Sequence, residues 1–163
     1  MTLNERIDAL EGRLQTADAT LRLMRNAPMA RYTTLHLGGP ASLLACPDKP
    51  EQVQLLLKEA HALDVPVIII GNGSNLLVKD GGIRGLVIRL CRDMQHIEVQ
   101  GNAIRAEAGA MMSTLSMAAA EANPNANFVI EHTTGLCSFY AEAGGLMIGF
   151  EGGYNTNKNN NEY

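Results

Sequence analysis

The feature that most constrains the fold is the run Val65–Ile70, which is β-branched at every position except Pro66 and leads directly into the glycine-containing segment Gly71–Asn75. β-Branched side chains pack well on a pleated surface, and a short continuous apolar run is typical of a strand buried on both faces. The sequence therefore predicts a strand at Val65–Ile70 near the centre of a compact unit.

The segments around this strand predict the α+β class. Asp48 and Glu51 have the spacing of a capping box, with Pro50 in the first turn, which indicates the start of a helix. The apolar face of that helix would consist of Val53, Leu56, Leu57, Ala60 and Leu63. Further strands are expected at Ser42–Cys46, Leu76–Val78, Leu86–Leu90, His96–Gln100 and Ile104–Ala108, the last two as a hairpin, with a helix at Met111–Ala122.

The N-terminal segment, residues 1–27, carries apolar residues at alternating steps of four and three from Leu3 to Met24. This spacing predicts a heptad helix over residues 3–25. Two interpretations remain open: the helix packs on its own domain, or it forms a weak parallel homodimer. In the dimer, Arg6 would face the partner's Glu11, and Arg13 would face the partner's Asp18.

The segment Gly71–Asn75 has the composition of a loop that binds a diphosphate. Glycines allow positive φ and leave no Cβ between a backbone N–H group and an anion, and Ser74 and Asn75 add side-chain donors. The segment lacks the third glycine of the Rossmann fingerprint, and an apolar segment rather than a helix pattern follows it. Because most Gly-x-Gly segments are ordinary turns, the neighbouring motifs decide between the two interpretations.

Four motifs in a fixed order give the chain a resemblance to a known family: Tyr32–Ala41, Gly71–Val78, Asp80–Ile88 and Ile104–Ala110. Over about residues 26–122 the chain resembles the UDP-N-acetylenolpyruvoylglucosamine reductases. Their flavin domain has the vanillyl-alcohol-oxidase-type (p-cresol-methylhydroxylase-type) FAD-binding fold. The resemblance implies the first subdomain of that fold over residues 28–122, with FAD as the cofactor.

What the resemblance implies about activity is specific. In that family hydride passes from NADPH to FAD and then to the enolpyruvyl double bond of a nucleotide sugar. The product is UDP-N-acetylmuramate, which is used in peptidoglycan synthesis. The implied cofactor-binding residues are Ile69, Ile70, Gly71, Asn72, Gly73, Ser74, Asn75, Leu76 and Gly109. Arg84 and Arg89 are candidate phosphate partners, for which solvated surface positions are the favoured interpretation.

The match ends at about Ala122. Residues 123–154 form a divergent Gly-rich segment, and the polar residues 155–163 are expected to be disordered. The family's catalytic arginine, serine and glutamate have no counterpart, and there is no metal-ligand spacing, so we assign no catalytic residue and no metal. We expect the chain as given to have little reductase activity. The alternative is a non-catalytic flavin- or nucleotide-binding module, or an interaction module that self-associates through the N-terminal helix.

Composition and charge limit the kinds of molecule that the chain is expected to bind. The net charge of −4 and the aromatic content of 4%, with no Trp, argue against nucleic acid. No apolar run is long enough to cross a bilayer, and early acidic residues argue against a leader. Cys46, Cys91 and Cys137 are widely separated, which is typical of reduced thiols. We therefore expect a cytoplasmic protein without a membrane partner.

Overall fold

The computed structural model describes residues 1–90, 92–101, 103–122, 128–130 and 139–141. The chain divides into two compact units, one comprising Met1–His96 with Glu107–Met111, and the other Ile97–Ala106 with the chain from Met112 onward. The sequence predicted a single subdomain over residues 28–122. The division arises because the second unit begins with a hairpin whose described strands pair only with each other. The predicted tail at 155–163 and most of segment 123–154 lie outside the described residues.

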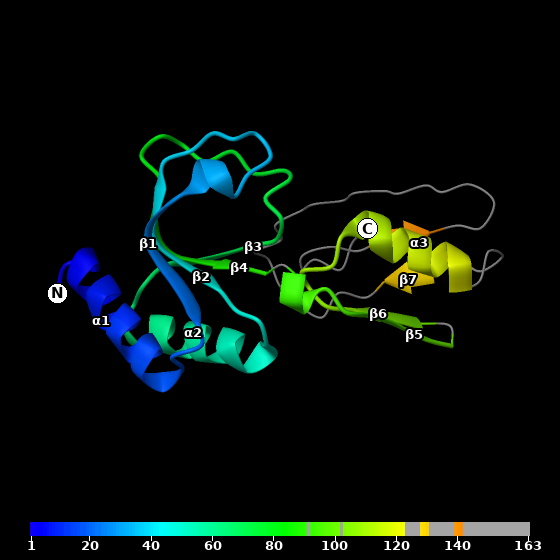
Figure 1. Cartoon of the computed structure of the whole chain (residues 1–163), viewed down its shortest axis with the longest axis horizontal. Helices are drawn as coiled ribbons and strands as arrows, with labels where there is room; N and C mark the ends of the chain where they lie inside the picture. Colours follow the sequence, from blue (N-terminus) through cyan, green and yellow to red (C-terminus); the bar gives the residue numbers. More distant parts are fainter. Residues whose placement is uncertain (91, 102, 123–127, 131–138, 142–163) are drawn as a thin grey trace, which may run out of the picture. The chain divides into compact units, whose positions relative to one another are not determined.

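The first unit is built on a four-stranded sheet in the order β1-β2-β4-β3 (Figure 1). Its strands are β1 (Arg22–Pro28), β2 (Pro40–Cys46), β3 (Val67–Ile70) and β4 (Ile83–Arg89). β1 runs antiparallel to β2, whereas β2, β4 and β3 are parallel. Parallel neighbours need a crossover connection. Helix α2 (Pro50–Ala62) makes one crossover, from β2 to β3, and loop 71–82 makes the other, from β3 to β4.

Each face of this sheet has its own core. Helices α1 (Leu3–Ala17) and α2 cover one face, which we call the helix face. Its buried residues include Ile7, Leu10, Leu14, Leu43, Leu56, Ala60, Leu86 and Ile88. The other face, the loop face, is covered by the short 3₁₀ helix η1 (Met29–Arg31), the segment that follows it, and loop 71–82. Its buried residues are Ala27, Met29, Ala41, Leu44, Ile70, Val78 and Val87.

The predicted central position of Val65–Ile70 was wrong. The strand is Val67–Ile70 and lies at the edge of the sheet, where Ile68 is 44% exposed and Ile69 is 45% exposed. The apolar run identified a strand correctly, but it could not give the pairing order, because β4 inserts between β2 and β3. The expected strand at Leu76–Val78 is part of the loop instead.

The predicted helix over residues 3–25 was also wrong in its length. Helix α1 ends at Ala17, where Asp18 has extended φ and ψ angles of −147° and 99°. The Asp18 carboxylate accepts hydrogen bonds from the Thr20 backbone N–H (2.9 Å) and hydroxyl (2.5 Å), a local turn that competes with helix. The chain then continues as β1, a strand that the heptad interpretation missed.

The apolar residues of the heptad pattern on α1 pack in the chain's own core. Ile7, Leu10 and Leu14 are fully buried against the helix face. The flanking charges also find partners within the chain: Arg6 pairs with Asp64, and Arg13 pairs with Glu59 at 3.2 Å. This arrangement supports the intramolecular interpretation of the pattern over the homodimer.

The N-cap of helix α2 lies one residue after Asp48, the predicted N-cap. Lys49 is the N-cap and makes no side-chain hydrogen bond there, while Pro50 occupies the first turn. The backbone N–H of Asp48 donates to Gln52 Oε1 at 2.9 Å. On the predicted apolar face, Leu57 is 40% exposed. Leu55 packs against the core in its place.

The buried amide of Gln52 connects the end of α1 to the start of α2. Its Nε2 donates to Asp18 Oδ2 (3.0 Å) and to Thr20 Oγ1 (3.2 Å). Lys49 Nζ lies 3.6 Å from the same carboxylate. Hydrogen bonds from the Thr20 hydroxyl, then from Gln52, lower the pKa of Asp18 well below its usual range.

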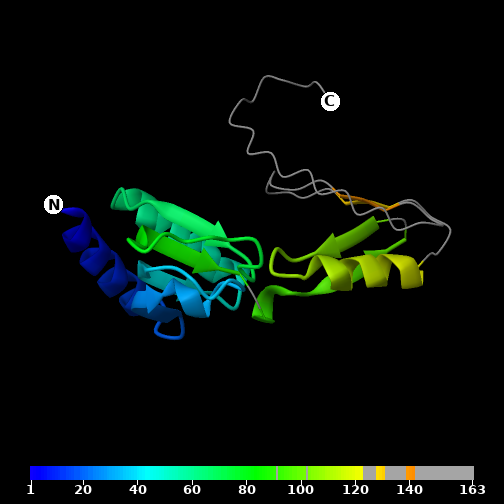
Figure 2. The same cartoon turned by 90° about the horizontal axis from the view of Figure 1, so that it is seen from above.

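In the second unit the predicted hairpin and helix are both present. β5 (Ile97–Gln100) pairs antiparallel with β6 (Ala103–Ala106), and α3 (Met112–Ala122) lies along β5 (Figure 2). Leu115 and Ala119 are buried on α3. β7 (Phe128–Ile130) pairs with β8 (Phe139–Ala141) and contacts β6. No helix among the described residues is long and apolar enough to cross a membrane.

We expect Leu10→Ala to lower the free energy of unfolding by about 2–5 kcal/mol, because it removes a fully buried side chain and leaves a cavity. Gln15→Ala, at an exposed position on the same helix, is the matched control and should change little. Urea denaturation measures both. Because the seam is intramolecular, the transition midpoint should not depend on protein concentration; a midpoint that rises with concentration would favour the homodimer.

The Asp18 carboxylate should make stability depend on acid pH. A pKa that is lower in the folded than in the unfolded state stabilises the fold above the unfolded value, and this contribution is lost as the pH falls through the folded-state pKa. Asp18→Asn should therefore destabilise the chain at pH 7, with a difference that shrinks below about pH 4. Denaturation midpoints between pH 7 and pH 2 test this, with Glu51→Gln on α2 as the control. A pH-independent difference would contradict it.

Candidate functional site

The implied cofactor-binding loop begins where β3 ends, at Ile70. Because β2, β4 and β3 are parallel, their carboxyl ends lie at the same edge of the sheet. Ligands of open α/β sheets bind in the crevice outside these carboxyl ends. Segment 71–76 is therefore placed where a ligand of such a sheet is expected.

A second loop, Tyr32–Gly39, holds this segment in place. The Thr34 backbone N–H donates to the Gly73 carbonyl at 3.2 Å, and the Thr34 hydroxyl donates to the Ser74 carbonyl at 3.0 Å. Further along, the Gly39 N–H donates to the Lys79 carbonyl at 3.0 Å. Thr33 is buried, and its hydroxyl donates to the Leu37 carbonyl at 3.2 Å. The positioning role of Thr34 was missed from the sequence, where its only signal was its place in the first motif.

The hydrogen bonds of the segment are one-sided. Its carbonyl groups at Gly73 and Ser74 accept from Thr34, whereas no described residue accepts a hydrogen bond from the backbone N–H groups of residues 71–75. Gly71, Ser74 and Asn75 are exposed. Successive available N–H groups favour an anion, as they do in phosphate-binding loops. The residues present therefore fit a diphosphate.

The two glycines of the segment have different roles. Gly73 has a φ of +68°, and a Cβ added to it would lie 2.1 Å from the Tyr32 carbonyl oxygen. The close approach of the neighbouring loop therefore requires glycine at position 73. A Cβ on Gly71 would have nothing within 4 Å, so the fold does not require glycine there. We expected both glycines to leave room for an anion to approach the backbone. The geometry is consistent with this role for Gly71, whereas the space beside Gly73 is filled by the Tyr32 carbonyl.

The remaining implied residues lie around the segment. Ile70 is 8% exposed and packs in the loop-face core, whereas Ile69, the preceding residue of the strand, points to the opposite face and is half exposed. Leu76 packs partly buried against the loop-face core. Gly109 is buried, and its N–H donates to the Met94 carbonyl at 2.9 Å, so this amide is committed within the fold.

The two candidate arginines differ in environment. Arg84 is exposed, as favoured from the sequence. Arg89 is only partly exposed, and its Cζ lies 5.3 Å from the centre of the Tyr32 ring, within the range of a cation–π contact. The solvated interpretation holds only in part for Arg89, whose contact with Tyr32 was not expected from the sequence. The signal that could have found it is its alternation with Val87, which places it on the loop face.

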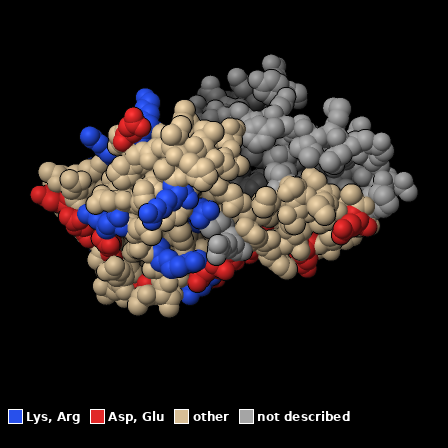
Figure 3. Space-filling view, turned by 45° about the horizontal axis from the view of Figure 1, so that its top comes forward, with Lys and Arg blue, Asp and Glu red and all other residues tan. Residues whose placement is uncertain are grey.

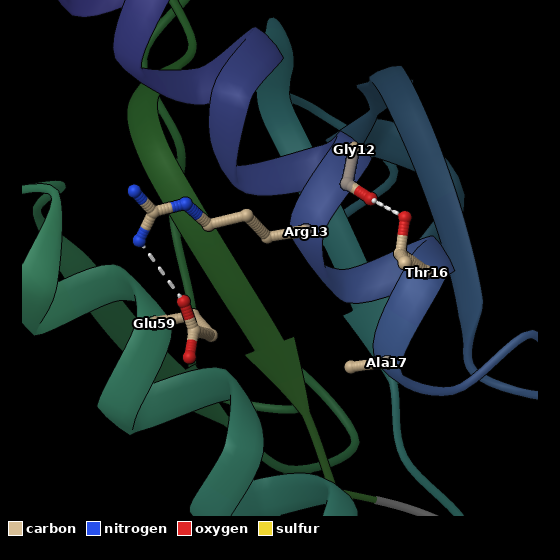
Figure 4. A pocket seen from close by; sticks show the side chains of 5 residues that line it. All are labelled: Gly12, Arg13, Thr16, Ala17 and Glu59. Carbon is tan, nitrogen blue, oxygen red and sulfur yellow. Dashed lines mark hydrogen bonds and ion pairs between the residues drawn. The ribbon is translucent and has the colours of Figure 1, made fainter.

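A groove of about 400 Å³ lies elsewhere, between α1 and α2, and is lined by Gly12, Arg13, Thr16, Ala17 and Glu59 (Figure 4). The Arg13–Glu59 ion pair crosses it at 3.2 Å. Charged side chains on the face shown in Figure 3 lie in several separate groups of both signs. No three potential metal ligands gather among the described residues. These features do not point to a second ligand.

The fold and the loop together define a class of protein. A family model described as an FAD binding domain matches residues 41–161, and the chain belongs to this family. The structure is similar to p-cresol methylhydroxylase with a TM-score of 0.54 at 16% identity, covering 78% of this chain and 27% of that one. This similarity confirms the α+β, p-cresol-methylhydroxylase-type fold expected from the four motifs.

The curated relatives are more specific. The chain is 43% identical over 115 residues to the UDP-N-acetylenolpyruvoylglucosamine reductase of Moorella thermoacetica, covering 71% of this chain and 37% of the relative. It is 46% identical over 92 residues to that of Desulforamulus reducens, covering 56% of this chain and 30% of the relative. The resemblance found from the sequence is confirmed. The chain spans about a third of the length of these relatives.

The contrast between the two glycines predicts a difference in stability. Gly73→Ala should lower the free energy of unfolding by at least about 1 kcal/mol, because the new Cβ collides with the Tyr32 carbonyl and positive φ disfavours a side chain. Gly71→Ala should leave stability within about 0.5 kcal/mol, as at other unconstrained surface positions. Thermal unfolding followed by circular dichroism measures both, and equal effects would contradict the assignment.

Proposed function

We propose that this chain provides the FAD-binding part of an NADPH-dependent reductase that converts UDP-N-acetylglucosamine enolpyruvate to UDP-N-acetylmuramate in the cytoplasm, for peptidoglycan synthesis. The observation that carries the proposal is the row of available N–H groups in Gly71–Asn75, anchored from behind by Thr34. The family match supports FAD as the ligand, and the named relatives support the reaction.

In this proposal the chain's own residues bind and orient the cofactor. The amides of Gly71, Asn72, Ser74 and Asn75 donate to the diphosphate, and the Ser74 hydroxyl and Asn75 side chain add donors. The partly buried Leu76 and the strand residue Ile70 supply apolar surface beside it, whereas Ile69 points to the opposite face of the sheet. The bound flavin would supply the hydride chemistry, as cofactors of this kind do.

The second candidate function is a flavin-binding module without catalysis. The sequence has no match to the family's catalytic motifs, so we expect FAD binding with little turnover by this polypeptide. A general acid in the correct position is typically worth a factor of about 10²–10⁴ in rate. Self-association through the N-terminal helix is the less supported alternative, because Ile7, Leu10 and Leu14 are buried within the chain.

Two glycine substitutions test the loop. Gly71→Val should weaken FAD binding by about tenfold or more, because the side chain would stand where the backbone must approach a phosphate. Gly81→Val is the matched control: it also lies in open space, in the same crossover loop, and should bind FAD as the unchanged chain does. Quenching of flavin fluorescence measures affinity, and circular dichroism checks that both variants fold. Equal affinities in the two variants would show segment 71–76 to be an ordinary turn.

The same preparation separates the two candidate functions. Oxidation of NADPH by the FAD-loaded chain is followed with and without UDP-N-acetylglucosamine enolpyruvate. Oxidation stimulated by the enolpyruvyl substrate supports a reductase, and FAD binding without stimulation supports the module.

A further inference from the structure

Arg89 is held beside the start of the candidate diphosphate loop. It is the last residue of β4 and lies in register with Ile70, the last residue of β3. The Leu90 N–H donates to the Ile70 carbonyl at 2.8 Å, so the two strand ends are tied together at this point. Gly71, the first residue of the loop, follows Ile70 directly.

The guanidinium of Arg89 contacts an aromatic ring, but no carboxylate among the described residues forms an ion pair with it. Its Cζ lies 5.3 Å from the centre of the Tyr32 ring, which orients the planar group. The Nε atom is buried, and no described residue accepts a hydrogen bond from it. None of the ion pairs among the described residues involves Arg89.

Arg6, the other arginine with a buried Nε that lacks a partner, gives a useful comparison. Its guanidinium is compensated, since Nη1 pairs with the Asp64 carboxylate and donates to the Asp64 carbonyl at 2.6 Å. Arg89 has no such carboxylate among the described residues. A guanidinium that is partly withdrawn from water and has no anion beside it favours an anion supplied by a ligand.

We propose that Arg89 is a phosphate-binding residue, whose guanidinium pairs with the diphosphate that the amides of Gly71–Asn75 bind. A guanidinium presents a planar set of donors that matches two phosphate oxygens at once. The Tyr32 ring, whose centre lies 5.3 Å from the Arg89 Cζ, contacts this guanidinium on the loop face. The identity of the ligand as FAD rests on the proposed function, whereas the anion site rests on the geometry of Arg89.

The test compares three ligands: FAD, riboflavin, which has the same ring system without phosphate, and inorganic pyrophosphate. Arg89→Met removes the charge and keeps a long side chain, and Arg84→Met makes the same change at an exposed position of the same strand. Arg89→Met should weaken FAD and pyrophosphate by about tenfold or more, and should lower the salt dependence of FAD binding. Riboflavin affinity should not change, and Arg84→Met should affect none of the three.

Arg89→Lys keeps the charge but loses the bidentate fork, so its FAD affinity should lie between those of Arg89→Met and the unchanged chain. It also covers the possibility that Arg89→Met folds poorly. Thermal unfolding without ligand is the structural control: Arg89→Met should change the melting temperature little, because it removes the contact with Tyr32 together with an uncompensated charge. A lowered melting temperature with unchanged affinity of Arg89→Lys for FAD would overturn the proposal.

The three ligands separate this proposal from the proposed function. If the unchanged chain binds FAD and Arg89→Met binds it equally well, Arg89 is not a phosphate-binding residue and the proposed function stands. If pyrophosphate binds in an Arg89-dependent way and FAD does not, the anion site stands and the proposed function fails. Binding of neither ligand by the unchanged chain would overturn both.

Discussion

The contact between two backbone loops on one face of the sheet determines the rest of the first unit. β3 and β4 are parallel, so the chain must cross the sheet between them, and it crosses as loop 71–82 rather than as a helix. The loop covers the apolar face with Leu76 and Val78, and its backbone packs against segment Tyr32–Pro40. A Cβ at Gly39 would lie 1.9 Å from the Asp80 carbonyl oxygen, and one at Gly73 would lie 2.1 Å from that of Tyr32. Two backbone segments approach this closely only where one of them has glycine.

This packing orients the candidate site. The carbonyl groups of Gly73 and Ser74 turn toward Thr34, which leaves the neighbouring N–H groups without described partners. The same contact brings Tyr32 over the guanidinium of Arg89. The start of this loop and Arg89, the last residue of the adjacent strand β4, lie at the carboxyl edge of one sheet. The proposed anion site thus follows from the way the chain covers its own core.

The N-terminal helix shows how one apolar pattern is compatible with two structures. A seam of Ile7, Leu10 and Leu14 suits a coiled coil or a single helix on a sheet, because both bury one narrow stripe. The local turn at Asp18 and Thr20 ends the helix before the pattern ends. Leu21 and Leu23 then continue the apolar pattern with the alternation of a strand. Charged side chains of α1 form ion pairs within the chain, and its apolar residues are buried there, so the helix does not require a second copy of the chain.

The sequence by itself determined the elements whose signals are local. It identified most of the strands, the helices α2 and α3, the β5–β6 hairpin and the loop Gly71–Asn75, because β-branching, proline, glycine and apolar spacing act over a few residues. Four ordered motifs also identified the FAD-binding family. The tertiary structure decided that β3 is an edge strand, that α1 ends at Ala17, that Gly73 is required by Tyr32, and that Arg89 lies beside the loop. Each of these depends on which distant segments pair or touch, and no local pattern carries that information.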